Sequence, residues 1–105
     1  MTESQYVLEK TVEDAAVDYA EKEFDCIVRK LTYPGRRGAP DRMFVFPNAV
    51  VMFLEFKRPK GGVRHPAQIR EINRFKGAGV RAAFVSTLEQ AKMLIRLAGS
   101  SRADS

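Results

Sequence analysis

The segment Val50-Val51-Met52-Phe53-Leu54 is apolar at every position. Because successive side chains of a strand point to opposite faces of the sheet, a strand of this composition is buried on both faces. A chain of 105 residues has room for one core only. The other elements must therefore cover this strand from both sides, and we expect an α/β fold with a central sheet flanked by helices.

Hydrophobic periodicity and turn residues predict seven elements in the order αβββαβα. Pro47-Asn48 is the expected turn of a hairpin, and the second helix is the crossover that places the fourth strand parallel to the third. Ile69, Ile72 and Phe75 mark the buried face of that helix. Residues 1–98 are predicted to form a single domain and residues 99–105 a flexible tail. The helices are predicted over residues 4–23, 66–76 and 87–97 and the strands over residues 26–32, 42–46, 49–56 and 80–86.

Positive charge is concentrated in the second part of the chain. The sequence has 18 Lys and Arg against 13 Asp and Glu, a formal charge of +5, and residues 1–25 are acidic. An uneven basic surface of this kind favours a polyanionic partner such as nucleic acid, with a merely solvated surface as the alternative.

The remaining composition excludes other classes of protein. Cys26 is the only cysteine, which excludes an internal disulfide and a cysteine-based zinc site. Cys26 also lies among apolar strand residues and is predicted to be a core thiol, while His65, the only histidine, is a helix cap or a DNA contact. No apolar run is long enough to span a bilayer, so we expect no membrane partner. The single cysteine suits a reducing setting, so we expect an intracellular, cytoplasmic location.

The apolar run passes directly into Glu55-Phe56-Lys57. Side chains two positions apart on a strand share a face, so Glu55 and Lys57 point the same way while Phe56 returns to the core. The simple alternative is a strand that leaves the core at this point. If the hairpin is centred on Asn48, however, Asp41 and Glu55 lie opposite each other on neighbouring strands.

Two opposed carboxylates repel each other unless a cation lies between them. A divalent ion such as Mg²⁺ meets that requirement, and the backbone carbonyl of Phe56 can serve as a further ligand. Lys57 can then position or deprotonate an attacking water, or stabilise charge on a phosphate. The alternative is an ion cluster neutralised by Lys57 alone. A bulge in the hairpin would shift this pairing, so the register is an assumption.

Gly38-Ala39-Pro40-Asp41 followed by Glu55-Phe56-Lys57 resembles the Pro-Asp and Glu-x-Lys motifs of the PD-(D/E)XK nucleases. With Pro34-Gly35-Arg36-Arg37-Gly38 before it and Gln68 after it, the pattern is similar to the VRR-NUC branch over residues 8–96. The resemblance implies a restriction-endonuclease-like core and phosphodiester cleavage with Mg²⁺ or Mn²⁺. For stand-alone members of virus or prophage type it also implies a symmetric homodimer that acts on branched DNA such as Holliday junctions.

The same resemblance implies further site residues. Members of the family place a glutamate of the first helix in the site; Glu9 fits best, and Glu13 is one turn away on the same face. Gln68 matches the family's glutamine, whose role is to orient the water or the phosphate. We expect phosphate contacts from five basic residues of the loops, although a solvated surface is the alternative for each: Arg36, Arg37, Arg58, Lys60 and Arg64.

The sequence thus predicts a metal-dependent, structure-selective DNA endonuclease with Asp41, Glu55 and Lys57 at its centre. One rival is a catalytically silent nucleic-acid-binding domain on the same scaffold, which needs the basic residues but not the carboxylates. Another is a nuclease subunit that requires a partner chain.

Overall fold

A computed structural model describes residues 2–101 of the chain, with side chains from residue 10 onward. The predicted order αβββαβα is confirmed. No helix among the described residues is long and apolar enough to cross a membrane. The helices are α1 Thr2–Phe24, α2 Pro66–Gly77 and α3 Leu88–Ser100, and the strands are β1 Ile27–Lys30, β2 Arg42–Val45, β3 Val51–Phe56 and β4 Arg81–Val85.

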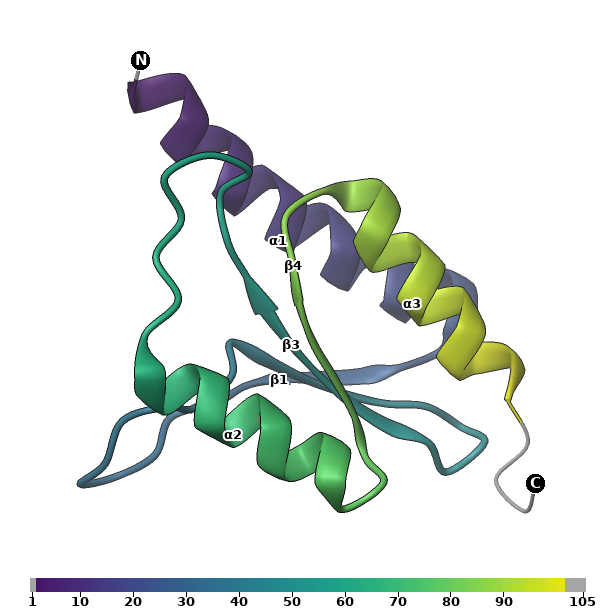
Figure 1. Cartoon of the computed structure of the whole chain (residues 1–105). Helices are drawn as coiled ribbons and strands as arrows, with labels where there is room; N and C mark the ends of the chain where they lie inside the picture. The colour runs from purple at the N-terminus through teal and green to yellow at the C-terminus, as the bar shows by residue number, and fades with distance from the viewer. Residues whose placement is uncertain (1, 102–105) are drawn as a thin grey trace.

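The four strands form one mixed sheet in the order β1-β2-β3-β4, with β3 and β4 parallel and the other neighbours antiparallel. Helices α1 and α3 pack against each other on one side of the sheet, and α2 lies on the other side (Figure 1). Arg42 pairs with Leu54 and Val45 with Val51, so the hairpin is centred on Asn48 as predicted.

Alternate residues of β3 face the two layers. Met52 and Leu54 are buried in a cluster with Ala16 of α1 and Ile95 of α3. Phe53 points the other way, where its ring stacks on Phe75 of α2 with the centroids 4.2 Å apart. The doubly covered strand expected from the apolar run is therefore present, because each of its faces has its own helical layer.

Two predictions about side chains and boundaries were wrong. Ile69 is 39% exposed, because in the first turn of α2 Ala67 lies against Gly38 and Gln68 contacts Glu55, and the buried residues of the helix are Glu71 and Ile72. Helix α3 ends at Ser100 rather than Leu97, so the predicted tail starts inside the helix. Asn48 explains this extension, since its Nδ2 donates to the carbonyl of Ala98 at 2.9 Å and stabilises the helix end.

The strands are shorter than predicted at several ends. β1 ends at Lys30, β2 at Val45 and β4 at Val85, and β3 starts at Val51. Ala49 has φ of 71°, a turn conformation that cannot belong to a strand. These differences affect the ends of the elements and leave the pairing of the strands unchanged.

Candidate active site

Asp41 and Glu55 lie where β2 begins and β3 ends. Because Arg42 pairs with Leu54, the next position along the hairpin places Asp41 opposite Glu55. The backbone carbonyl of Asp41 accepts from the amide of Leu31 at 3.2 Å, and its carboxylate Oδ2 accepts from the amide of Phe56 at 2.8 Å. Backbone contacts on both sides thus hold the Asp41 side chain against the end of β3.

Glu55 is 2% exposed, and its two carboxylate oxygens have different surroundings. Oε2 accepts from Nε2 of Gln68 at 2.6 Å and contacts Nζ of Lys57 at 3.0 Å. Oε1 is buried and has no hydrogen-bond partner among the described residues. A buried oxygen without a partner costs about 1–3 kcal/mol, so this atom is a candidate ligand for a cation.

The pKa shifts of Asp41 and Glu55 indicate that positive charge is lacking around these two carboxylates. Burial and, second, the charge of Asp41 raise the pKa of Glu55 to about 7 against the opposing effect of Lys57. Burial also raises the pKa of Asp41, although the hydrogen bond from Phe56 opposes this shift. One ammonium group therefore does not compensate two carboxylates in this environment.

The oxygen ligands of Asp41 and Glu55 suit Mg²⁺ or Mn²⁺ better than they suit a metal ion that takes all of its ligands from side chains. Within residues 10–101 no group of three or more His, Cys, Asp or Glu side chains is arranged to hold a metal ion. Mg²⁺ commonly takes only one or two carboxylates and completes its shell with water and substrate phosphate. Asp41 and Glu55 provide that number of carboxylates, so the donor set fits such an ion.

The two glutamates considered for the first helix differ in what is known of them. Glu9 lies outside the residues whose side chains the structure describes. Glu13 binds Arg42 through Oε2 and Nε at 2.7 Å, and its charge contributes to the raised pKa of Asp41. Glu13 is thus near the carboxylate pair but is engaged in an ion pair.

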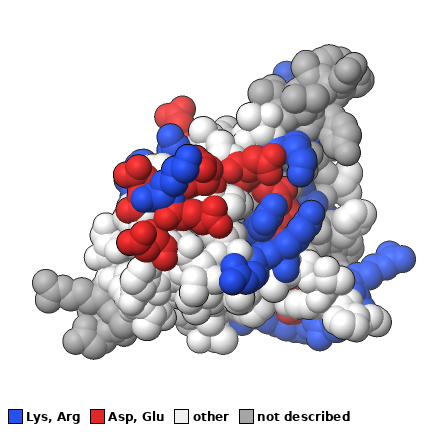
Figure 2. Space-filling model, turned by 180° about the vertical axis from the view of Figure 1, so that it is seen from behind, with Lys and Arg blue, Asp and Glu red and all other residues white. Residues whose placement is uncertain are grey.

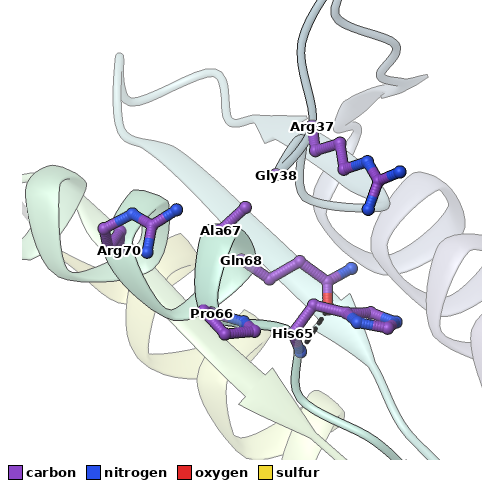
Figure 3. A pocket seen from close by; sticks show the side chains of 7 residues that line it. All are labelled: Arg37, Gly38, His65, Pro66, Ala67, Gln68 and Arg70. Carbon is purple, nitrogen blue, oxygen red and sulfur yellow. Dashed lines mark hydrogen bonds between the residues drawn. The ribbon is translucent and has the colours of Figure 1, made fainter.

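Gln68 connects the start of α2 with Glu55. Its Oε1 accepts from the amide of His65, the residue that caps the helix, at 3.4 Å, while its Nε2 donates to Glu55. His65 and Gln68 line a pocket of about 610 Å³ together with Arg37 and Gly38 from the loop before β2 (Figure 3). Gln68 therefore connects this pocket with Glu55.

The five predicted DNA-binding residues lie in two groups. Arg37 lines this pocket, while Arg36 binds Glu71 at 3.1 Å. The others lie on the loop between β3 and α2, where Arg58 donates to the carbonyl of Gly61, Arg64 stacks on Phe84 and Lys60 is exposed. Seen from behind, acidic side chains gather on one part of the surface, with basic side chains among them and beside them (Figure 2).

Cys26 has no role in this site. It is buried, as predicted, and burial raises the pKa of its thiol to about 11, with smaller contributions from Asp25 and Glu21. A thiol of this kind remains protonated and is not a nucleophile at neutral pH.

Comparison with known proteins identifies the family. No family model matches the chain. A solved structure described as a VRR_NUC domain matches with a TM-score of 0.66 at 35% sequence identity, over 81% of this chain and 95% of that one. "Putative nuclease p44" of Acyrthosiphon pisum secondary endosymbiont phage 1 is 35% identical over 68 residues, which are 65% of this chain and 72% of the relative. The chain belongs to the VRR-NUC family. The predicted family and fold class are thereby confirmed.

The VRR-NUC domain also contains a polar cluster that sequence reasoning missed. Glu71 is 9% exposed and accepts from the hydroxyl of Tyr33 at 2.5 Å, while Arg36 and Arg74 bind its Oε1. The only sequence signal was a single acid in α2 with Arg70 and Arg74 beside it. Its partners in the loop are more than thirty positions away along the chain, so the cluster was not predictable from spacing.

Proposed function

We propose that this VRR-NUC nuclease is a Mg²⁺- or Mn²⁺-dependent endonuclease that hydrolyses phosphodiester bonds of DNA. The observation that carries the proposal is the buried, unpartnered Oε1 of Glu55 beside Asp41. Two carboxylates with raised pKa values and one neighbouring ammonium group create a demand for a cation.

The residues of the site would divide the work as follows. Asp41, Glu55 and the carbonyl of Phe56 would hold the ion, with Glu9 of α1 as a further ligand and Glu13 as the alternative. When bound, such an ion polarises a phosphate oxygen and lowers the pKa of water. Lys57 would hold the attacking water or stabilise negative charge on the phosphate, because its ammonium lies 3.0 Å from Glu55 Oε2 at the same strand end.

Gln68 acts on this arrangement by fixing one oxygen of Glu55. Its hydrogen bond of 2.6 Å keeps Oε2 directed toward α2, which leaves Oε1 for the ion. Outer contacts of this kind orient metal ligands and affect activity strongly. From the same place Gln68 can orient the water or the phosphate in the adjoining pocket.

Branched DNA such as a Holliday junction is the substrate we propose. Arg36, Arg37, Arg58, Lys60 and Arg64 would bind phosphates by charge, which positions a nucleic acid without reading its bases. One domain has one site, and two symmetric cuts in a junction require two sites. We therefore infer a twofold homodimer, which light scattering of the purified protein would test.

Incubation of the purified chain with labelled duplex, flap and four-way-junction DNA tests the proposal. We expect cleavage with Mg²⁺ or Mn²⁺, preference for the junction and none after chelation. Asp41→Asn should remove cleavage and retain DNA binding. DNA binding without cleavage in the unmodified protein would favour a silent binding domain, and cleavage that appears only with a second chain would favour a partner-dependent subunit.

A further inference from the structure

A groove lined by arginines adjoins the pocket beside Glu55. The groove has a volume of about 350 Å³ and shares Arg37, Ala67 and Arg70 with the larger pocket. It continues along α2 to Arg74 and along the preceding loop to Arg36. Together the two cavities therefore extend from Gln68, which contacts Glu55, to Arg74.

Positive charge exceeds negative charge in this groove. Arg37 and Arg70 have no ion-pair partner among the described residues, and both are exposed. Arg36 and Arg74 share one carboxylate, that of Glu71. Four guanidinium groups thus face one carboxylate, which leaves the groove suited to an anion with several oxygens.

Glu71 is placed to orient Arg36 and Arg74, and its single charge does not neutralise the groove. Its side chain is 11% exposed, whereas those of Arg36 and Arg74 are 55% and 67% exposed. Tyr33 holds Oε2, so Oε1 is directed toward both guanidinium groups. The ring of Tyr33 makes a second contact, a cation–π interaction in which the guanidinium carbon of Arg36 lies 4.9 Å from the ring centroid.

We propose that this groove binds the DNA backbone at phosphates away from the bond that is cut, with Arg37, Arg70 and Arg74 as phosphate ligands and Glu71 as a positioning residue. From Gln68 to Arg74 the helix rises about 9 Å. This corresponds to roughly two or three nucleotide steps of one strand. The inference rests on the proposed function, because the groove needs a nucleic acid in the neighbouring pocket.

The test is the salt dependence of DNA binding, measured in the Asp41→Asn background with a chelator so that no cleavage occurs. Arg70→Gln/Arg74→Gln should weaken binding on the order of tenfold and reduce the slope of log K against log salt by about 2. The matched control is Lys92→Gln/Arg96→Gln, which has the same spacing on α3, in the layer across the sheet. An unchanged slope in the control and a reduced slope in the Arg70/Arg74 variant is the expected result.

Equal slopes in the two double variants would overturn the groove. Because binding is measured without cleavage, a protein that never cuts DNA still gives a slope, so failure of the proposed function is recognised separately in the cleavage assay. If the protein cleaves DNA normally and the two slopes are equal, the proposed role of the groove is contradicted and the proposed nuclease function is not.

Glu71→Gln separates positioning from simple charge. The substitution makes the groove more positive, so free arginines would bind DNA more tightly. Loss of ordered arginines instead predicts binding roughly threefold weaker. Circular dichroism shows whether this variant folds; if it does not, Tyr33→Phe removes the hydrogen bond to Glu71 without changing the charge of the groove. Tighter or unchanged binding in a folded variant contradicts the role of Glu71.

Discussion

Two buried glutamates of the described part of the chain, Glu55 and Glu71, have opposite electrostatic environments. Burial and Asp41 raise the pKa of Glu55 to about 7. The pKa of Glu71 is lowered, chiefly by the hydrogen bond from Tyr33 and further by Arg36 and Arg74. Both carboxylates lie on the side of the sheet covered by α2, so the difference comes from their neighbours. Glu55 lacks a cation, whereas Glu71 has an excess of them.

This contrast assigns different tasks to the two sites. Glu55 has a raised pKa and an unpartnered carboxylate oxygen, so it is suited to bind a cation that the protein's own side chains do not supply. Glu71 accepts from three donors, and it thereby holds the guanidinium groups of Arg36 and Arg74 in place. The first site is suited to chemistry and the second to holding the substrate.

The largest expected effect is on cleavage. Glu55→Gln should lower the cleavage rate on the order of 10³-fold or more, since a metal ion supplies several kcal/mol of charge stabilisation. DNA affinity should change little. Glu71→Gln should show the reverse, with weaker binding and a cleavage rate at saturating DNA that is nearly normal. Single-turnover rates and binding constants for both variants measure this; equal loss of rate in both would remove the distinction.

The second prediction concerns stability in the absence of metal. A carboxyl whose pKa is raised on folding binds more protons in the folded state, so its stabilising contribution is lost as pH rises from 4.5 to about 7. We expect the unfolding free energy of the unmodified protein to fall by about 3 kcal/mol over this window relative to Glu55→Gln. Denaturant titrations with a chelator present measure it.

Glu71 should show the opposite sign. Its lowered pKa contributes stability above the ordinary pKa of a carboxyl, and this stability is lost on acidification. Glu71→Gln should therefore be less stable than the unmodified protein at neutral pH, and the difference should shrink in acid. The same sign of pH dependence for Glu55 and Glu71 would contradict the comparison.

A smaller effect is expected for Gln68→Ala, which removes a hydrogen bond to Glu55. Cleavage should fall about tenfold, with DNA binding retained. Gln90→Ala is the matched control, because Gln90 has the same place in the first turn of α3 and its side chain accepts from the backbone amides of Ser86 and Thr87. An equal loss of activity in the control would mean that Gln68 acts through the stability of the protein alone.

The smallest effect is expected for Tyr33→Phe. Loss of the hydrogen bond to Glu71 should cost about 1 kcal/mol of unfolding free energy. Tyr19→Phe serves for comparison, because the hydroxyl of Tyr19 accepts only a 3.5 Å contact from the exposed Arg96 and its loss should be nearly neutral. Equal stability changes in the two variants would argue against a fixed Glu71.

The central hairpin could be predicted from the sequence because its pairing follows from a period of two and a short turn. Counting outward from Asn48 predicted that Asp41 lies opposite Glu55, and the observed pairing of Arg42 with Leu54 has this register. Lys57 was predicted on the face of Glu55 because it lies two residues further along, and its ammonium lies 3.0 Å from Glu55 Oε2 just beyond the end of β3. Contacts fixed by local periodicity are thus readable without coordinates.

The cluster around Glu71 could not be predicted in this way. It depends on an irregular loop that brings Tyr33 and Arg36 back onto α2, and Gly38 at φ of 105° allows that loop to approach Ala67 closely. A Cβ at Gly38 would lie 2.8 Å from the carbonyl oxygen of Ala67, so the approach requires glycine. Similarly, helical periodicity predicted a buried Ile69, because it does not reveal which side chains of a first turn the neighbouring elements cover.

Calorimetric titration with Mn²⁺ at a pH above 7 tests the central claim most directly. The unmodified protein and Glu71→Gln should both bind the ion, and Glu55→Gln should give no binding heat, because Oε1 of Glu55 is the buried side-chain oxygen without a partner among the described residues. No binding to the unmodified protein, or equal binding to Glu55→Gln, would contradict the assignment of Asp41 and Glu55 as the metal site.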